Sequence, residues 1–289
     1  MPIALIQPTD IVFQAVCDPA APSQPDLAGV VTLSLAAGAT VGLGAAAYRV
    51  FGSRGQSETV IVPEGAQAVF DPSFNSGQDV LILGGDFGDY CFQLLGSTVR
   101  ATSANGTAID VPLGGAGLRF GFDDSFQRAS FDPATGELSF HQLSGIPPAV
   151  PEIDPAAVSR IVLSPNGETS VGLGAFTVFG RPAGEETLTL GAGALVTLDP
   201  SFNQGGDTIV MPGASGDFER TRDGSTLVFD DGEGTVLRLP FGLESTFVTF
   251  DNGRFQVFFD QDDDEVEFQR VITPTADMGD LMPVEALIL

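Results

Sequence analysis

An internal repeat covers most of the chain and constrains its fold more than any other feature. The segment Asp71–Asn75 recurs without change as Asp199–Asn203, at a sequence offset of 128. Upstream, Val41–Gly44 matches Val171–Gly174 at an offset of 130, which predicts two extra residues in the first copy between positions 45 and 48. These matches indicate duplication of a whole domain. Other identical pairs at 128 are Val50–Gly52 with Val178–Gly180, Asp79 with Asp207, Pro112 with Pro240, and Phe122-Asp123 with Phe250-Asp251.

The length of the repeat favours two separate domains. Solenoid and propeller repeats have periods of about 20 to 50 residues, and each copy here is long enough to bury a core of its own. The linker is rich in proline, so it would either hold the domains apart as an extended spacer or let them dock. We expect an N-terminal arm (1–29), a first β-domain (30–143), the linker (144–160), a second β-domain (161–260) and an acidic tail (261–289).

Inside each copy, short runs of β-branched and aromatic residues are separated by Gly, Pro, Asn and Asp. This spacing predicts an all-β protein in which each copy is an antiparallel β-sandwich or a barrel-like domain. No segment has a sustained helical period. The expected strands include Val30–Leu35, Thr59–Val62, Val80–Leu83, Tyr90–Leu95, Ala108–Val111 and Leu118–Phe122, then Leu188–Leu190, Thr208–Met211, Thr226–Phe229, Val236–Leu239, Phe247–Phe250 and Arg254–Phe259.

The repeated Asp-Pro-Ser-Phe-Asn loop has two interpretations. In the structural one, the Asp71 carboxylate caps a short turn, Pro72 takes its first position and Phe74 enters the core. In the other, the loop binds Ca²⁺, which prefers about six to eight oxygen ligands at flexible positions. The ligands would be Asp71, Asn75 and Asp79 in the first copy and Asp199, Asn203 and Asp207 in the second.

A cluster of six acidic residues lies between positions 260 and 267. Asp260, Asp262 and Asp264 have the spacing that opens an EF-hand loop. Such a loop needs Gly at its sixth position and Glu at its twelfth, whereas this chain has Glu265 and Val271 there. The EF-hand motif therefore fails, and the cluster is either a loose divalent-cation site or a solvated acidic stretch.

The charge of the chain excludes several partners. There are 12 Lys and Arg residues against 38 Asp and Glu residues, a net charge of −26. Nucleic-acid binding needs clusters of cations, and an anionic membrane surface would repel this chain. The sequence contains no apolar run of about 18 residues, so we expect no membrane-spanning helix.

The chain has two cysteines, Cys17 and Cys91. They form either one bridge from the arm to the first domain or two separate thiols.

We expect no enzymatic activity, because the sequence has no catalytic constellation. His141 is the only histidine, so a zinc site with two His ligands is impossible, and a Ser-His-Asp triad would depend on this residue. The 38 acidic residues allow many carboxylate pairs of the glycosidase kind, but nothing singles out one of them.

A longer pattern resembles a known family. The run Asp199–Gly213 is followed by Asp217-Phe218, Gly224-Ser225, Pro240–Gly242 and Phe250–Gly253. The pattern resembles a β-domain repeated in large surface proteins that alphaproteobacteria export by type I secretion, often beside RTX calcium-binding segments. The resemblance implies an extracellular structural or adhesive role. RTX nonapeptides of the form Gly-Gly-x-Gly-x-Asp are absent from this chain.

The two ends of the chain bear on export. The N-terminus has no basic region and no long apolar run before a cleavage site, so we expect no cleaved signal peptide. The last residues are an acidic residue followed by an apolar end. They resemble the uncleaved C-terminal signal of type I secretion substrates, or they form a short element on the last domain. These residues are Glu285, Ala286, Leu287, Ile288 and Leu289.

Together these features predict a secreted bacterial surface protein that assembles with itself as a layer, filament or matrix, with Ca²⁺ as the candidate cofactor. The alternative is an adhesin for a polysaccharide or a receptor, and a hydrolase comes third. In the N-terminal arm, the apolar run Ile11, Val12 and Phe13 would add a strand to the sheet edge of a neighbouring copy or of its own domain. Ca²⁺ or salt outside the cell would relieve the self-repulsion of the acidic surface.

Overall fold

The computed structural model describes Pro25 and residues 29–115, 117–132, 134–144, 149–150, 152–242, 245–260 and 265–271, without the side chains of Ser144, Asn203 and Glu265. These residues form 24 strands and four short 3₁₀ helices, so the all-β prediction is confirmed. No helix within this part of the chain is long and apolar enough to cross a membrane.

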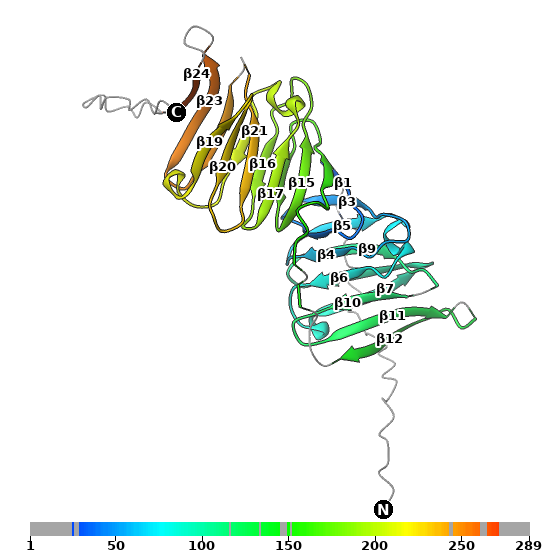
Figure 1. Cartoon of the computed structure of the whole chain (residues 1–289). Coiled ribbons are helices and arrows are strands. Elements are labelled where there is room, and N and C mark those ends of the chain that lie inside the picture. Colours follow the sequence, from blue (N-terminus) through cyan, green and yellow to red (C-terminus); the bar gives the residue numbers. More distant parts are fainter. Residues whose placement is uncertain are drawn as a thin grey trace, which may run out of the picture.

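Each copy is a parallel β-solenoid (Figure 1). In the first copy the chain alternates between two sheets, and each strand pairs in parallel with the strand one coil later. Thr32 pairs with Arg49 at an offset of 17 and Thr59 pairs with Val80 at an offset of 21, and these two values bracket the length of a coil. The coils are built from β1 (Val31–Ser34), β2 (Thr40–Gly42), β3 (Ala47–Phe51), β4 (Thr59–Val62), β5 (Gln67–Phe70), η1 (Phe74–Ser76) and β6 (Val80–Leu83).

The prediction of an antiparallel sandwich or barrel is therefore wrong. The inference from the length of the repeat that the chain is not a solenoid is wrong as well. The unit that stacks is the coil, which repeats several times inside each copy. Within a coil the strands alternate between buried and half-exposed residues, as in β4 and β6. Val60 lies against Leu81 in the next coil, and both are fully buried. Each coil thus covers the apolar face of its neighbour, which is how solenoids build a core.

The second copy repeats the first strand by strand. Arg160 pairs with Thr177 at the same offset of 17 that separates Thr32 from Arg49, so the offset of 128 between the copies holds in the first coil too. The two extra residues expected before position 48 are therefore absent, and Tyr48 takes the same place as Phe176. The coils are β13 (Ser159–Val162), β14 (Glu168–Val171), β15 (Gly174–Phe179), β16 (Thr187–Leu190), β17 (Ala194–Leu198), η3 (Pro200–Asn203) and β18 (Thr208–Val210).

Antiparallel strands close the far end of each solenoid. After β6 the chain forms a hairpin that pairs with the last coil of one sheet, and a second hairpin extends the other sheet. In the first copy these elements are η2 (Phe87–Asp89), β7 (Tyr90–Leu95), β8 (Thr98–Ser103), β9 (Ala108–Pro112), β10 (Leu118–Gly121), β11 (Phe126–Asp132) and β12 (Glu137–Ser144). In the second they are η4 (Ser215–Asp217), β19 (Glu219–Asp223), β20 (Thr226–Asp230), β21 (Val236–Pro240), β22 (Thr246–Phe250), β23 (Gly253–Asp260) and β24 (Glu265–Arg270).

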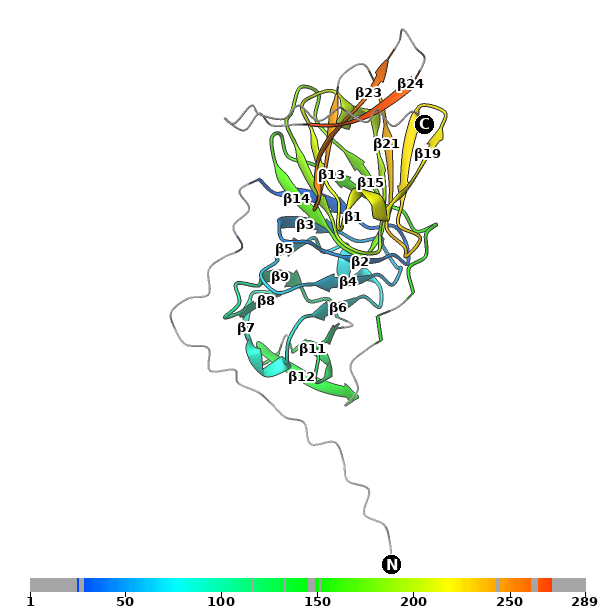
Figure 2. The ribbon, with the colours of Figure 1, turned by 90° about the vertical axis from the view of Figure 1, so that its left-hand side faces the viewer.

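The two solenoids meet head to head through their first coils (Figures 1 and 2). Strand β1 pairs antiparallel with β13, with Leu33 opposite Ile161, and this pairing makes one sheet of 12 strands. On the other side Leu43 bridges to Val171, and the Gly42 amide donates to the Leu173 carbonyl at 2.6 Å. The two copies are therefore docked, and the linker does not hold them apart.

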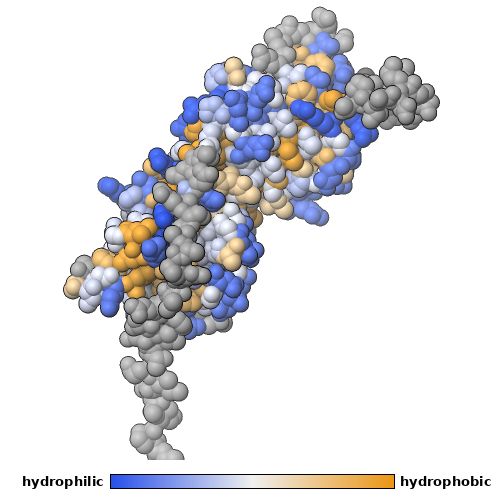
Figure 3. Space-filling view, turned by 180° about the vertical axis from the view of Figure 1, so that it is seen from behind, coloured by the Kyte–Doolittle hydropathy of each residue, from blue (hydrophilic) through white to orange (hydrophobic). Residues whose placement is uncertain are grey.

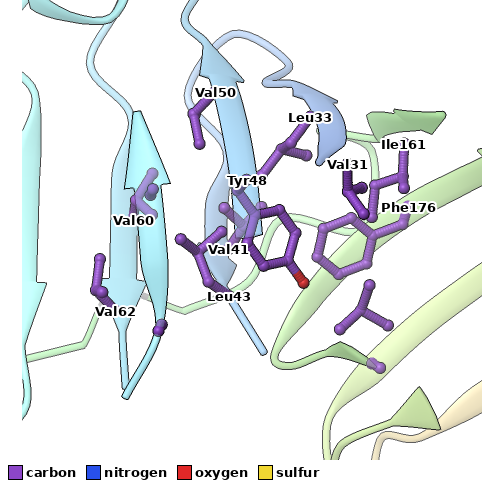
Figure 4. Packing of buried hydrophobic residues seen from close by; sticks show 14 of the residues in the cluster. Val31, Leu33, Val41, Leu43, Tyr48, Val50, Val60, Val62, Ile161 and Phe176 are labelled. Atoms are coloured by element: carbon purple, nitrogen blue, oxygen red, sulfur yellow. The ribbon is translucent and has the colours of Figure 1, made fainter. Parts of the chain in front are cut away.

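One hydrophobic core runs through this junction. Val31, Ile161 and Phe176 pack beside Tyr48, which comes from the first copy (Figure 4). The Tyr48 hydroxyl accepts a hydrogen bond from the Gly44 amide and donates one to the Ser170 carbonyl of the second copy. Burial raises the pKa of Tyr48, so the hydroxyl stays a donor at any ordinary pH.

We expect Tyr48→Phe to lower the free energy of unfolding by about 1 to 2 kcal/mol, because the partly buried Ser170 carbonyl loses its donor. Urea denaturation measures this change. The substitution keeps the ring and its packing. A loss below about 0.5 kcal/mol, the lower end for a net hydrogen bond, would show that the bond across the junction contributes little to stability.

Candidate functional site

The repeated loop has the structural role that the first interpretation predicts. Asp71 Oδ1 accepts a hydrogen bond from the Ser73 amide at 2.9 Å, and Asp199 Oδ1 accepts one from the Ser201 amide at 2.9 Å. Phe74 is fully buried, as is its counterpart Phe202. Each loop turns the chain from one sheet to the other at a corner of the third coil.

Beside each loop lies a buried pair of carboxylic acids. Glu58 and Asp79 are 1% and 2% exposed, and their counterparts Glu186 and Asp207 are both at 0%. The Glu58 amide donates to Asp79 Oδ1 at 2.8 Å, and the Glu186 amide donates to Asp207 Oδ1 at 2.9 Å. Each pair thus joins the corner of the second coil to that of the third. We call Glu58/Asp79 and Glu186/Asp207 the corner pairs.

Within the described part of the chain, several oxygens of the corner pairs have no hydrogen-bond donor. Both carboxylate oxygens of Glu58 and Oδ2 of Asp207 are buried in this way. In the second copy, Glu186 accepts two long hydrogen bonds, from the amides of Asn166 at 3.3 Å and Arg181 at 3.4 Å. A buried acceptor without a donor is costly, and a buried unpaired charge costs more.

A bound proton relieves both costs. The pKa of Glu58 is raised to about 8. Burial is the largest cause, and the adjacent Asp79 carboxyl is the second. Burial raises the pKa of Asp207 to about 7, against the Glu186 amide that lowers it, and the carboxylates of Glu186 and Glu185 add to the rise. Each corner pair therefore holds a proton near neutral pH, in the manner of two carboxyls that share one site.

The predicted calcium ligands serve different contacts in the structure. Asp71 caps the turn, the Asn75 amide nitrogen donates to the Pro112 carbonyl at 2.7 Å, and Asp79 belongs to a corner pair. The side chain of Asn203 lies outside the described residues. Among the described residues, no group of three acidic, His or Cys side chains is placed to hold a metal ion. A Ca²⁺ site at these loops stays a prediction.

The other predicted site residues are only partly described. Asp260 ends β23 and lies opposite Glu265 in the register with β24. His141 is an exposed residue of β12, opposite Arg128. Cys91 lies on β7 and is disulfide-bonded. The remaining predicted residues fall outside the described part: Ile11, Val12, Phe13, Cys17, Asp262, Asp264, Glu285, Ala286, Leu287, Ile288 and Leu289.

A crevice of about 250 Å³ lies along β15, β17 and β21, beside the segment that leads into β13. Its lining is mostly apolar and includes Val158 and Phe176, with Arg238 as the charged residue and no carboxylate. A glycosidase needs two carboxyl groups in its cleft, so this crevice lacks the groups for that chemistry. Asp207 does not reach this crevice or the surface, because it is fully buried.

Sequence reasoning missed Glu58 and Glu186, the acids that complete the corner pairs. A signal was present, because the two glutamates are related by the same offset of 128 and each precedes the aspartate of its pair by an offset of 21. That spacing is one coil, so it acquires meaning only once the coil is known.

Comparisons with known proteins assign no family. No family model and no curated protein matches the chain. Among solved structures, the chain is similar to the extracellular lipase LipA from Serratia marcescens, with 13% sequence identity and a TM-score of 0.15. The alignment covers 68% of this chain and 38% of the lipase chain. A likeness at this score gives no basis for assigning a fold or an activity.

Proposed function

We propose that the chain is a non-enzymatic structural protein, exported to the bacterial surface, that assembles with further copies through the ends of its solenoid body. The observation that carries this proposal is the head-to-head junction. It uses the first coils, where β2 and β14 are the outer strands of their sheets. The remaining outer strands of the described sheets lie at the two far ends: β7 and β12 at one, β19 and β24 at the other. Outer strands of a sheet are templates for pairing with another chain.

The two ends differ in charge. Strand β12 has no acidic or Arg residue from Leu138 to Ser144, and its Leu143 is 45% exposed. At the other end, β24 carries Glu265, Glu267 and Arg270. Hydrophobic residues also gather over the first solenoid on the face seen in Figure 3. Charged residues protect sheet edges from pairing, so the β12 edge of the first copy is the association surface that these strands favour.

The overall charge sets the condition for assembly. A net charge of −26 keeps separate molecules apart by repulsion. Salt shortens the range of that repulsion to between a few ångströms and about 10 Å, depending on its concentration. Assembly would therefore begin where Ca²⁺ or salt is plentiful, outside the cell. The disulfide at Cys91 fits the same setting, because disulfides persist in oxidising compartments.

The test is the state of the purified protein with Ca²⁺ and with chelator, followed by negative-stain microscopy and light scattering. We expect ordered polymers or concentration-dependent oligomers with Ca²⁺. Leu143→Lys should weaken association at least tenfold, because it places a charge on the β12 edge. Val158→Lys is the matched control: Val158 is equally exposed, at 45%, but lies next to the junction.

Two outcomes contradict the proposal. One is a monodisperse monomer in both conditions over the concentration range that light scattering covers. The other is saturable binding to polysaccharides on a glycan array by wild-type protein that does not assemble, which would establish the adhesin alternative instead.

A further inference from the structure

Among the described strands, β7 is an outer strand that lacks charged side chains. Its sequence, Tyr90–Leu95, contains no charged residue, and Leu95 is 39% exposed. Its counterpart in the second copy, β19 (Glu219–Asp223), has four charged residues out of five. Outer strands are normally guarded by charged side chains or covered by another segment. The second copy uses charge, so the first copy needs a cover.

The difference between the copies centres on one position. Cys91 pairs with Thr102, and Glu219 pairs with Asp230, so the registers place cysteine in the first copy where the second has glutamate. Cys91 is disulfide-bonded, and the chain has two cysteines. The other is Cys17, in the N-terminal arm outside the described residues.

The arm is long enough to reach β7 of its own chain. In the sheet order, β3, β5, β9 and β8 lie between β1 and β7, a distance of about 24 Å at ~4.8 Å per strand. The segment from Cys17 to Val31 spans up to about 46 Å when extended. A bond within one chain therefore fits, and the arm continues beyond it to the apolar run 11–13.

We propose that the N-terminal arm covers the edge of β7 in its own chain, with Ile11–Phe13 as an added strand and a Cys17–Cys91 disulfide as its lock. Alternation along a strand supports this pairing. Cys91 shares a face of β7 with Leu95, while Ile11 and Phe13 share a face with Cys17 by position. The added strand would thus place two large apolar side chains beside the exposed Leu95, and backbone hydrogen bonds would supply the rest of the affinity.

Two measurements on full-length oxidised protein test the proposal. Peptide mapping without reductant should recover a Cys17–Cys91 peptide from monomers. Hydrogen exchange with mass spectrometry should show the β7 amides exchanging at least tenfold more slowly in wild type than in a variant with Ile11→Asp and Phe13→Asp. The amides of β19 are the internal control and should not change. Neither residue lies in the described core, so the variant is expected to fold.

Three results would overturn the proposal. Equal exchange of β7 in wild type and variant would show that the arm does not cover this edge. A Cys91 bonded to glutathione or left reduced would remove the lock. Mixed disulfides between light and ¹⁵N-labelled chains, formed on co-oxidation as readily as those within one chain, would mean that the arm pairs with a neighbouring copy.

Discussion

Raising the pH from 5 to 9 should lower the free energy of unfolding, and the double variant Glu58→Gln with Asp207→Asn should lose most of that dependence. The folded pKa values, about 8 for Glu58 and about 7 for Asp207, lie above the ordinary values of 4.5 and 3.8. Between these limits the folded protein keeps a proton that the unfolded chain releases. Stability therefore falls as the pH rises, by up to about 1.4 kcal/mol per pH unit for each retained proton.

The double variant separates the contribution of the corner pairs to the pH dependence from that of the other ionisable groups. An amide at either position stays neutral and can donate to the partner carboxylate, so the group with the raised pKa is removed from each pair. Urea denaturation at several pH values gives the slope. Glu233→Gln is the control, because Glu233 is exposed and lies outside the corner pairs. A wild-type slope that persists unchanged in the double variant would show that the corner pairs are not the groups that titrate.

Gly77→Ala and Gly205→Ala should each destabilise the protein by about 3 kcal/mol or more, a loss typical of steric clashes in a packed interior. A Cβ at Gly77 would lie 1.4 Å from the Gln56 carbonyl oxygen, and one at Gly205 would lie 1.8 Å from the Gly184 carbonyl oxygen. Backbone must move to admit either methyl group, at the corners that hold the buried acids.

The chain offers matched controls for this pair. Gly88 and Gly216 are related by the same offset, adopt no left-handed backbone, and have open space where a Cβ would point. Ala at either position should leave stability within about 0.5 kcal/mol of wild type. Thermal or urea denaturation compares the four variants. Similar losses at all four glycines would show that the close approach is not the cause, because Gly→Ala by itself lowers the entropy of the unfolded chain and stabilises the folded state.

The individual strands were predictable from the sequence, but their partners were not. Alternation inside runs such as Thr59–Val62 and Val80–Leu83 is a local property, and both form strands as expected. Pairing depends on what lies one coil away. The offset between paired strands varies from 17 to 21, and it becomes 41 where the β7–β8 hairpin is inserted between β5 and β9. No fixed short period therefore appears in the sequence, and the antiparallel sandwich was the natural but wrong inference.

The candidate site was predictable to the same extent. The caps by Asp71 and Asp199 follow from residue type and position in a turn, so reasoning from the loop found them. Glu58 is charged, and nothing near it in the sequence indicates burial. Its burial comes from the stacking of coil corners, which places Asp79 beside it. The head-to-head junction likewise has no local signature.

That junction also explains what the duplication achieved. Strand β1 of one copy meets the equivalent strand β13 of the other in antiparallel register, which is the arrangement of an isologous homodimer. A single ancestral unit would have exposed its first coil and would have needed a second molecule to cover it. Fusion makes the two units equal in number and raises their effective concentration to about the millimolar range or above. The present chain therefore corresponds to a dimer whose two units cannot separate on dilution.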